Sequence, residues 1–104
     1  MFQATPISIT GTGAAYEKQL GFVPAVVFLR NETTGYSVLW TSDMADASCH
    51  QVTDAGAFSK VTANGITPIE NEDGKSDGFS IGALANVNDT ASEVLIGYAL
   101  RGKE

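Results

Sequence analysis

The fold is decided in the last third of the chain, by DGFSIG (77–82), ANVND (85–89) and EVLIGYALRG (93–102). Two apolar runs flank a loop of small residues and asparagines. From Val94 onward the side chains alternate: Val94, Ile96, Tyr98 and Leu100 share one side, while Leu95, Gly97, Ala99 and Arg101 share the other. A period of two residues predicts a β-strand, here with one face of large residues and one of smaller residues.

A second pair of apolar runs predicts a β-hairpin in the first half of the chain. The run 25–30 is apolar on both faces, which indicates a central strand, and Pro24 is suited to its beginning because proline has no amide hydrogen. The turn 31–35 contains Gly35. In the partner strand 36–41, the side chains of Tyr36, Val38 and Trp40 fall on one face.

The remaining segments extend the β pattern. Residues 2–11 alternate and predict a first strand or an extended arm, and residues 42–48 are the only stretch with helical character, enough for a turn or two. Further strands are expected at 51–53, 57–62 and 66–69, with Asn64-Gly65 as a tight turn. The sequence therefore predicts an all-β, single-domain β-sandwich over residues 1–104. About eight short antiparallel strands favour the jelly-roll variety, with 1–11 as either an N-terminal arm or an edge strand.

Composition limits the kinds of partner. The chain has 104 residues, of which 17% are charged, and a net charge of −6. So few charges are compatible with a surface that another protein covers and equally with a neutral soluble domain. The six basic residues are scattered singly, which argues against nucleic-acid binding, and no apolar run approaches the ~20 residues of a membrane-spanning helix.

No arrangement of residues predicts an enzyme, a metal site or a cofactor. Cys49 and His50 are neighbours in a strand, so their side chains are expected to diverge and to serve structural roles. The acidic segment 70–77 lacks the spacing of a calcium loop and is interpreted as a solvated turn. Trp40 and Tyr98 are compatible with a sugar-stacking platform, although filling of the core or of an interface is favoured.

The order of several short motifs resembles small β-sandwich domains of tailed-bacteriophage structural proteins, both tail-fibre modules and capsid decoration (cement) proteins. The motifs that carry the resemblance are Gly21-Phe22-x-Pro24-x-x-Val27, Trp40-Thr41 with Met44-Ala45-Asp46, Asn64-Gly65-Ile66, Gly78-Phe79-Ser80-Ile81-Gly82 with Asn86-Val87-Asn88, and Tyr98-Ala99-Leu100-Arg101. They span the chain from about Ile9 to Gly102. A chain of this size is more similar to a decoration protein than to a module of a long fibre.

The resemblance implies a virion structural protein that binds the major capsid protein on the outer surface of the head, with no cofactor. It also implies a homodimer or homotrimer. The start of the chain lacks the features of a signal peptide, so synthesis in the bacterial host cytoplasm is expected. The alternative is a receptor- or carbohydrate-binding module of a tail or tail fibre, and a third option is a tail-tube or baseplate accessory protein.

Candidate contacts with the capsid or with another copy are Phe2, Ile7, Ile9, Trp40 and Met44. Residues 2–10 are expected to form an arm that adds a strand to a neighbour's sheet, because their alternation has no evident partner nearby in the sequence.

Overall fold

The structure is a computed structural model that describes residues 4–71 and 73–101. Within these residues the chain forms eight β-strands and no helix. The strands are β1 (Ala4–Thr12), β2 (Tyr16–Gln19), β3 (Pro24–Asn31), β4 (Ser37–Thr41), β5 (Ser48–Val52), β6 (Phe58–Ile69), β7 (Gly78–Ile81) and β8 (Ala91–Arg101). No helix in this part of the chain therefore has the length and apolarity needed to cross a membrane.

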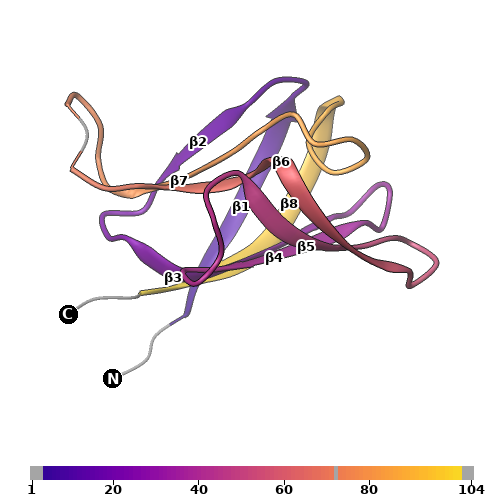
Figure 1. The fold of residues 1–104 in the computed structure, drawn as a ribbon. Coiled ribbons are helices and arrows are strands. Elements are labelled where there is room, and N and C mark those ends of the chain that lie inside the picture. The colour runs from indigo at the N-terminus through magenta and orange to yellow at the C-terminus, as the bar shows by residue number, and fades with distance from the viewer. Residues whose placement is uncertain (1–3, 72, 102–104) are drawn as a thin grey trace.

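All eight strands belong to one antiparallel sheet with the order β1-β8-β3-β4-β5-β6-β7-β2. The sheet curls until it is nearly barrel-shaped, with β2 and β7 on one side and β3, β4 and β5 on the other (Figure 1). The predicted all-β fold of eight antiparallel strands is confirmed. Neighbouring strands are hydrogen-bonded along the whole sheet order, from β1 at one end to β2 at the other. The two layers expected of a sandwich are therefore the two halves of one curled sheet.

One hydrophobic core fills the inside of the curled sheet. Trp40 and Phe79 are the largest side chains in it, and both are almost fully buried. The other core residues come from seven strands and from the loop 82–90, so one core ties together strands that are distant in sequence: Ile7, Ile9, Val27, Leu29, Val38, Cys49, Ile66, Ile81, Leu84, Val87, Leu95 and Ala99.

The predicted hairpin is confirmed. β3 and β4 pair in register, with Val27 opposite Trp40 and Leu29 opposite Val38. β3 also pairs with β8 on its other side, so it lies inside the sheet as its apolar composition predicted. The turn between β3 and β4 is organised by the buried Asn31, whose side-chain oxygen accepts hydrogen bonds from the backbone N–H groups of Thr33 and Thr34 at 2.8 and 2.9 Å.

Asn31 also joins this turn to the loop 82–90. Its amide nitrogen donates to the Val87 carbonyl at 2.9 Å and to Glu93 Oε1 at 3.0 Å. Nearby, the buried Asn88 donates to the carbonyls of Ala14 and Gly82 at 3.2 and 3.1 Å. The side-chain amides of Asn31 and Asn88 hold the loop 82–90 against the end of the sheet. Moving the loop away would leave these buried groups without hydrogen-bond partners, which would lower the stability of the fold.

β8 turns its smaller side chains toward the core and its larger ones outward, the reverse of the usual arrangement. The face of smaller residues, with Leu95 and Ala99 fully buried, points into the core, and the face of large residues points outward. Gly97 lies opposite Leu29 of β3, and a Cβ atom at this position would collide with the backbone carbonyl of Phe28. The close approach of β3 and β8 therefore requires glycine here.

Two local predictions are wrong. Residues 42–47 form turns and no helix, and Ser48 already begins β5. These six residues are too few to offset the cost of starting a helix when β5 can pair on both sides. Asn64-Gly65 does not end a strand, because β6 continues from Phe58 to Ile69.

β6 instead bends at Asn64-Gly65. Asn64 has a positive φ of 62°, and a Cβ atom on Gly65 would lie 2.7 Å from the Ser48 carbonyl carbon. The strand pairs with β5 up to this bend and mainly with β7 after it. The Asn-Gly pair therefore turns one strand around a corner of the barrel, as a bulge does.

The short strand β2 was not predicted. It has only four residues, Tyr16–Gln19, with charged side chains at Glu17 and Lys18, and among the described strands it pairs only with β7. A short charged strand at the end of a sheet is hard to distinguish from a loop by hydrophobic alternation.

The first strand has a partner within its own chain. β1 pairs with β8 over most of its length, from Ala4 opposite Leu100 to Thr12 opposite Ala91, and it is the terminal strand in the sheet order. Of the two sequence interpretations, residues 4–11 therefore form an edge strand and not a free arm. The same register places the two ends of the described chain, at Ala4 and Arg101, next to each other.

Candidate docking surface

The outward side of β8, β3, β4, β5 and β6 presents one surface rich in apolar side chains. The register aligns Tyr98, Phe28, Leu39 and His50 in one row across four strands, and Ile96, Arg30, Ser37, Val52 and Phe58 in the next row. We call this surface the outer face, and it consists of Val26, Phe28, Arg30, Ser37, Leu39, Thr41, His50, Val52, Phe58, Lys60, Ile96, Tyr98 and Leu100.

The outer face contains every large hydrophobic side chain that is markedly exposed in the described part of the chain. The exposed fractions are 67% for Phe58, 47% for Ile96, 39% for Tyr98 and 36% for Leu39. Phe28 stacks on Tyr98 with ring centroids 5.5 Å apart, and His50 contacts Phe58 at 5.2 Å. Exposed apolar side chains gathered in one place mark an interaction site more often than the same residues scattered singly.

The charges of the outer face are of one sign. None of its residues is an aspartate or a glutamate, although the chain has twelve of them. Its formal charges are those of Arg30 and Lys60, both exposed, and neither forms an ion pair with a described residue. By contrast, Lys75 contacts Glu17 at 2.7 Å, and the Arg101 guanidinium lies over the ring of Phe22 at 5.2 Å.

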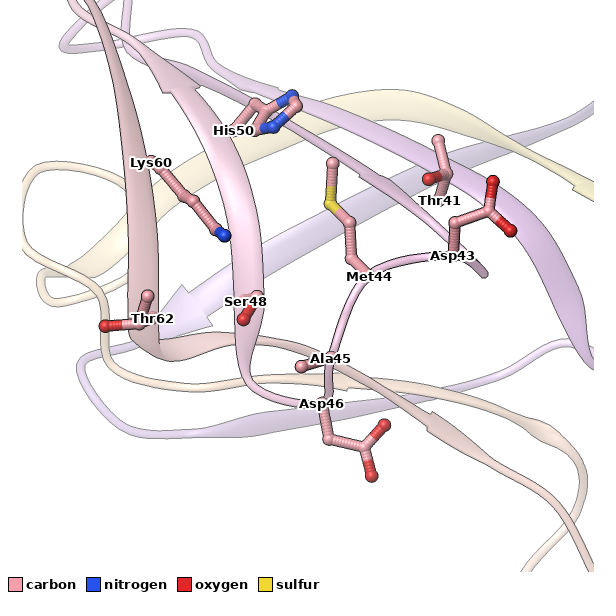
Figure 2. A pocket seen from close by; sticks show the side chains of 9 residues that line it. All are labelled: Thr41, Asp43, Met44, Ala45, Asp46, Ser48, His50, Lys60 and Thr62. Atoms are coloured by element: carbon pink, nitrogen blue, oxygen red, sulfur yellow. The ribbon is translucent and has the colours of Figure 1, made fainter.

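A pocket of about 570 Å³ opens beside the outer face, between the loop 42–47 and strands β5 and β6. Thr41, His50 and Lys60 belong to both the pocket and the outer face. Figure 2 shows Lys60 reaching from β6 toward Ser48 on β5, and Met44 pointing from the loop toward His50. Asp43 and Asp46 lie on the loop side, so the pocket combines charges of both signs around a methionine.

The structure places the predicted contact residues mainly in the core. Ile7, Ile9 and Trp40 are at most 2% exposed, and their side chains are inside the curled sheet. As the chain is folded here, these side chains are not available to a partner. Met44 is half-buried, packs against the core and lines the pocket, and Phe2 lies outside the described residues.

The exposed residues of the outer face were not among the predicted contacts. Their signal was present in the sequence, because Ile96 and Tyr98 belong to the large-residue face of the last strand. Large apolar residues ordinarily face the core, and only the folded sheet, which buries Leu95 and Ala99 and leaves Ile96 and Tyr98 exposed, shows that here they do not.

The other candidate residues do not assemble into a chemical site. Cys49 and His50 diverge as predicted, with Cys49 in the core and His50 on the outer face, and burial raises the pKa of the Cys49 thiol to about 11. Trp40 and Tyr98 lie on opposite faces of the sheet, so they form no common platform. No group of three metal-binding side chains occurs within residues 4–71 and 73–101.

Comparisons with protein-family models, with curated proteins and with solved structures found no match to this chain.

Proposed function

We propose that this protein is a bacteriophage virion structural protein that decorates the outside of the capsid and docks on it through the outer face. The observation that carries the proposal is the concentration of exposed apolar side chains on one side of the sheet, at Leu39, Phe58, Ile96 and Tyr98. The motif order described above supplies the expectation of a virion protein. Docking requires a surface whose apolar side chains lose water readily, and Leu39, Phe58, Ile96 and Tyr98 are of this kind.

The size of the outer face indicates how attachment works. Its apolar part covers roughly four to five strands about 4.8 Å apart and three rows about 6.8 Å apart, which corresponds to a projected area of about 400 Å². A stable protein interface buries about 800 Å² on each partner. One outer face alone therefore supports weak docking, and durable attachment depends on many copies, or on a homo-oligomer, binding the repeated subunits of a shell.

The first experiment is a copy-number measurement. Quantitative mass spectrometry of purified particles of the source phage is expected to find hundreds of copies that scale with the major capsid protein. A dozen copies or fewer would place the protein in the tail, and absence from the particle would refute the proposal.

A variant experiment connects attachment with the outer face. Ile96→Asp places a carboxylate at a site that is 47% exposed, so the fold should persist while the docked state would have to bury a charge. We expect attachment to stripped capsids to fall at least tenfold. Glu32→Asp, in the exposed turn after β3, is the control and should attach normally. Normal attachment of Ile96→Asp would show that docking uses another surface.

A carbohydrate- or receptor-binding module of a tail fibre is the second candidate, and the exposed rings of Tyr98 and Phe58 favour it. Sugars stack on such rings but also need carboxylates or amides nearby to bind their hydroxyl groups. The outer face has no such side chain. A glycan array with the wild-type protein tests this function; binding of a defined sugar that Tyr98→Ala abolishes would establish it.

A further inference from the structure

We infer that the partner surface bound by the outer face is itself apolar and carries carboxylates that pair with Arg30 and Lys60. This inference rests on the proposed docking function and adds the chemistry of the partner. Arg30 belongs to the row that also contains Ile96 and Phe58, so it lies among the apolar side chains of the outer face. Lys60 follows on β6, next to His50 of β5, at the mouth of the pocket.

The energetic argument starts from the fact that docking would cover these two cations. Neither has an ion-pair partner among the described residues, and an unpaired charge removed from water costs several kcal/mol. A purely apolar partner would leave both Arg30 and Lys60 unpaired and out of water, so this cost would arise at each of the two cations. A partner that offers a carboxylate to each cation avoids this cost and gains charge-assisted hydrogen bonds.

The spacing of the two cations is defined by the sheet. Arg30 is three strands away from β6 along its row, which ends at Phe58, and Lys60 lies two residues farther along β6. Three strand spacings and one two-residue step separate the two backbone positions by about 16 Å measured along the sheet, and the curl of the sheet shortens the straight-line distance. The partner is therefore expected to carry two acidic positions at about this separation, reduced or increased by the reach of the two long side chains.

The same charges disfavour two other occupants. Another copy packed face to face would bring a second set of cations. The outer face has no carboxylate to pair with them, and Asp43 and Asp46 lie on the loop side of the pocket, outside the outer face. An anionic membrane would attract Arg30 and Lys60, but it would repel the net charge of −6, including Glu32 and Asp54 in the turns beside the outer face. An apolar, acidic protein surface is the occupant that satisfies both the apolar residues and the cations.

Charge reversal tests the inference with capsids that have been stripped of this protein. Arg30→Glu and Lys60→Glu are each expected to weaken binding at least tenfold, because each places a carboxylate opposite a carboxylate. Lys75→Glu makes the same change of net charge, away from the outer face, and breaks an exposed ion pair with Glu17, so it should bind within about twofold of wild type. Thermal melting of all three variants checks that they are folded.

Zero-length carbodiimide coupling gives a direct reading of the contact. It joins a lysine amine to a carboxylate that touches it, so mass spectrometry of the coupled particles is expected to find Lys60 joined to an aspartate or glutamate of the capsid protein. Joining of Lys60 to an acidic residue of a second copy of this chain would overturn the inference and assign the outer face to self-association.

Three further outcomes separate failure of the inference from failure of the proposed function. Wild-type binding that neither charge reversal weakens would overturn the inference and leave the proposed function standing. Absence of wild-type binding to stripped capsids would overturn both. Vesicles of phosphatidylcholine with phosphatidylserine are expected to bind no protein; binding that Arg30→Glu and Lys60→Glu abolish would assign the cations to a lipid surface.

Discussion

Gly97→Ala tests the close packing of β8 against β3. The added Cβ would lie 2.7 Å from the Phe28 carbonyl carbon and 2.9 Å from the Leu29 Cα, and it would collide with the Phe28 carbonyl oxygen. Ordinary contacts of a Cβ begin near 3.4 Å. All three atoms belong to the backbone of β3, which is held by β4 on its other side and anchored in the core by Val27 and Leu29. β3 and β8 must therefore separate locally by about 1 Å.

The cost of that separation has two parts. Lengthening two ladder hydrogen bonds from about 2.9 Å to about 3.9 Å removes them, at roughly 1 kcal/mol each. Displacing the packed core around Leu29 adds about 1–3 kcal/mol. The free energy of unfolding should thus fall by about 3–5 kcal/mol, out of the roughly 5–15 kcal/mol typical of a chain of this size. The corresponding fall in Tm is of the order of 15–30 °C.

The assay is thermal and urea unfolding followed by circular dichroism and by the fluorescence of Trp40. Gly21→Ala is the control, because Gly21 is exposed, has a positive φ of 83° and has open space around its Cβ position. It should cost about 1 kcal/mol, from backbone strain alone. A Gly97→Ala protein that melts within a few degrees of wild type would refute the reasoning, whereas a Gly97→Ala chain that does not fold while Gly21→Ala folds would support it.

Three further predictions concern the interior. Asn31→Ala removes four hydrogen bonds and leaves the Val87 carbonyl without its side-chain donor. The free energy of unfolding, measured in urea, should therefore fall by about 3 kcal/mol, and a fall of less than about 1 kcal/mol would contradict this. The Cys49 thiol should react with a thiol reagent at neutral pH only after unfolding, since it is fully buried and its pKa is raised to about 11, and rapid reaction of the folded protein would be inconsistent with the core position. Because the pKa of Cys49 is higher in the folded chain than in the unfolded chain, its contribution to stability is complete below pH 9.0 and is lost as the pH rises toward 11. Between these pH values the urea midpoint of the wild-type protein should fall more than that of the Cys49→Ala protein.

Much of the fold could be predicted from local patterns. The β3–β4 hairpin follows from an apolar run on each side of a glycine-containing turn, and the alternation from Val94 correctly indicates a strand. What failed depends on contacts between distant segments. Asn64-Gly65 has the sequence of a tight turn, but the packing of Gly65 against Ser48 makes it a bend inside one strand.

The candidate surface could be predicted only in part. The sequence indicated few charges and correctly separated the two faces of the last strand. It did not indicate which face is outside, because that depends on which side of the sheet encloses the core, and the predicted contacts Ile7, Ile9 and Trp40 were therefore chosen among residues that fill the core. Hydrophobicity alone assigns large apolar residues to the interior, and an interaction surface is the exception to that rule.

The pairing of Ala4 with Leu100 has a consequence for engineering. Since the two described ends emerge side by side at one end of the β1–β8 ladder, a short linker could join them and new termini could be opened in the exposed turn 54–56 between β5 and β6. Such a circular permutant would keep every strand pairing. The neighbouring ends also allow a foreign peptide or a whole domain to be fused there, beside the β1–β8 ladder.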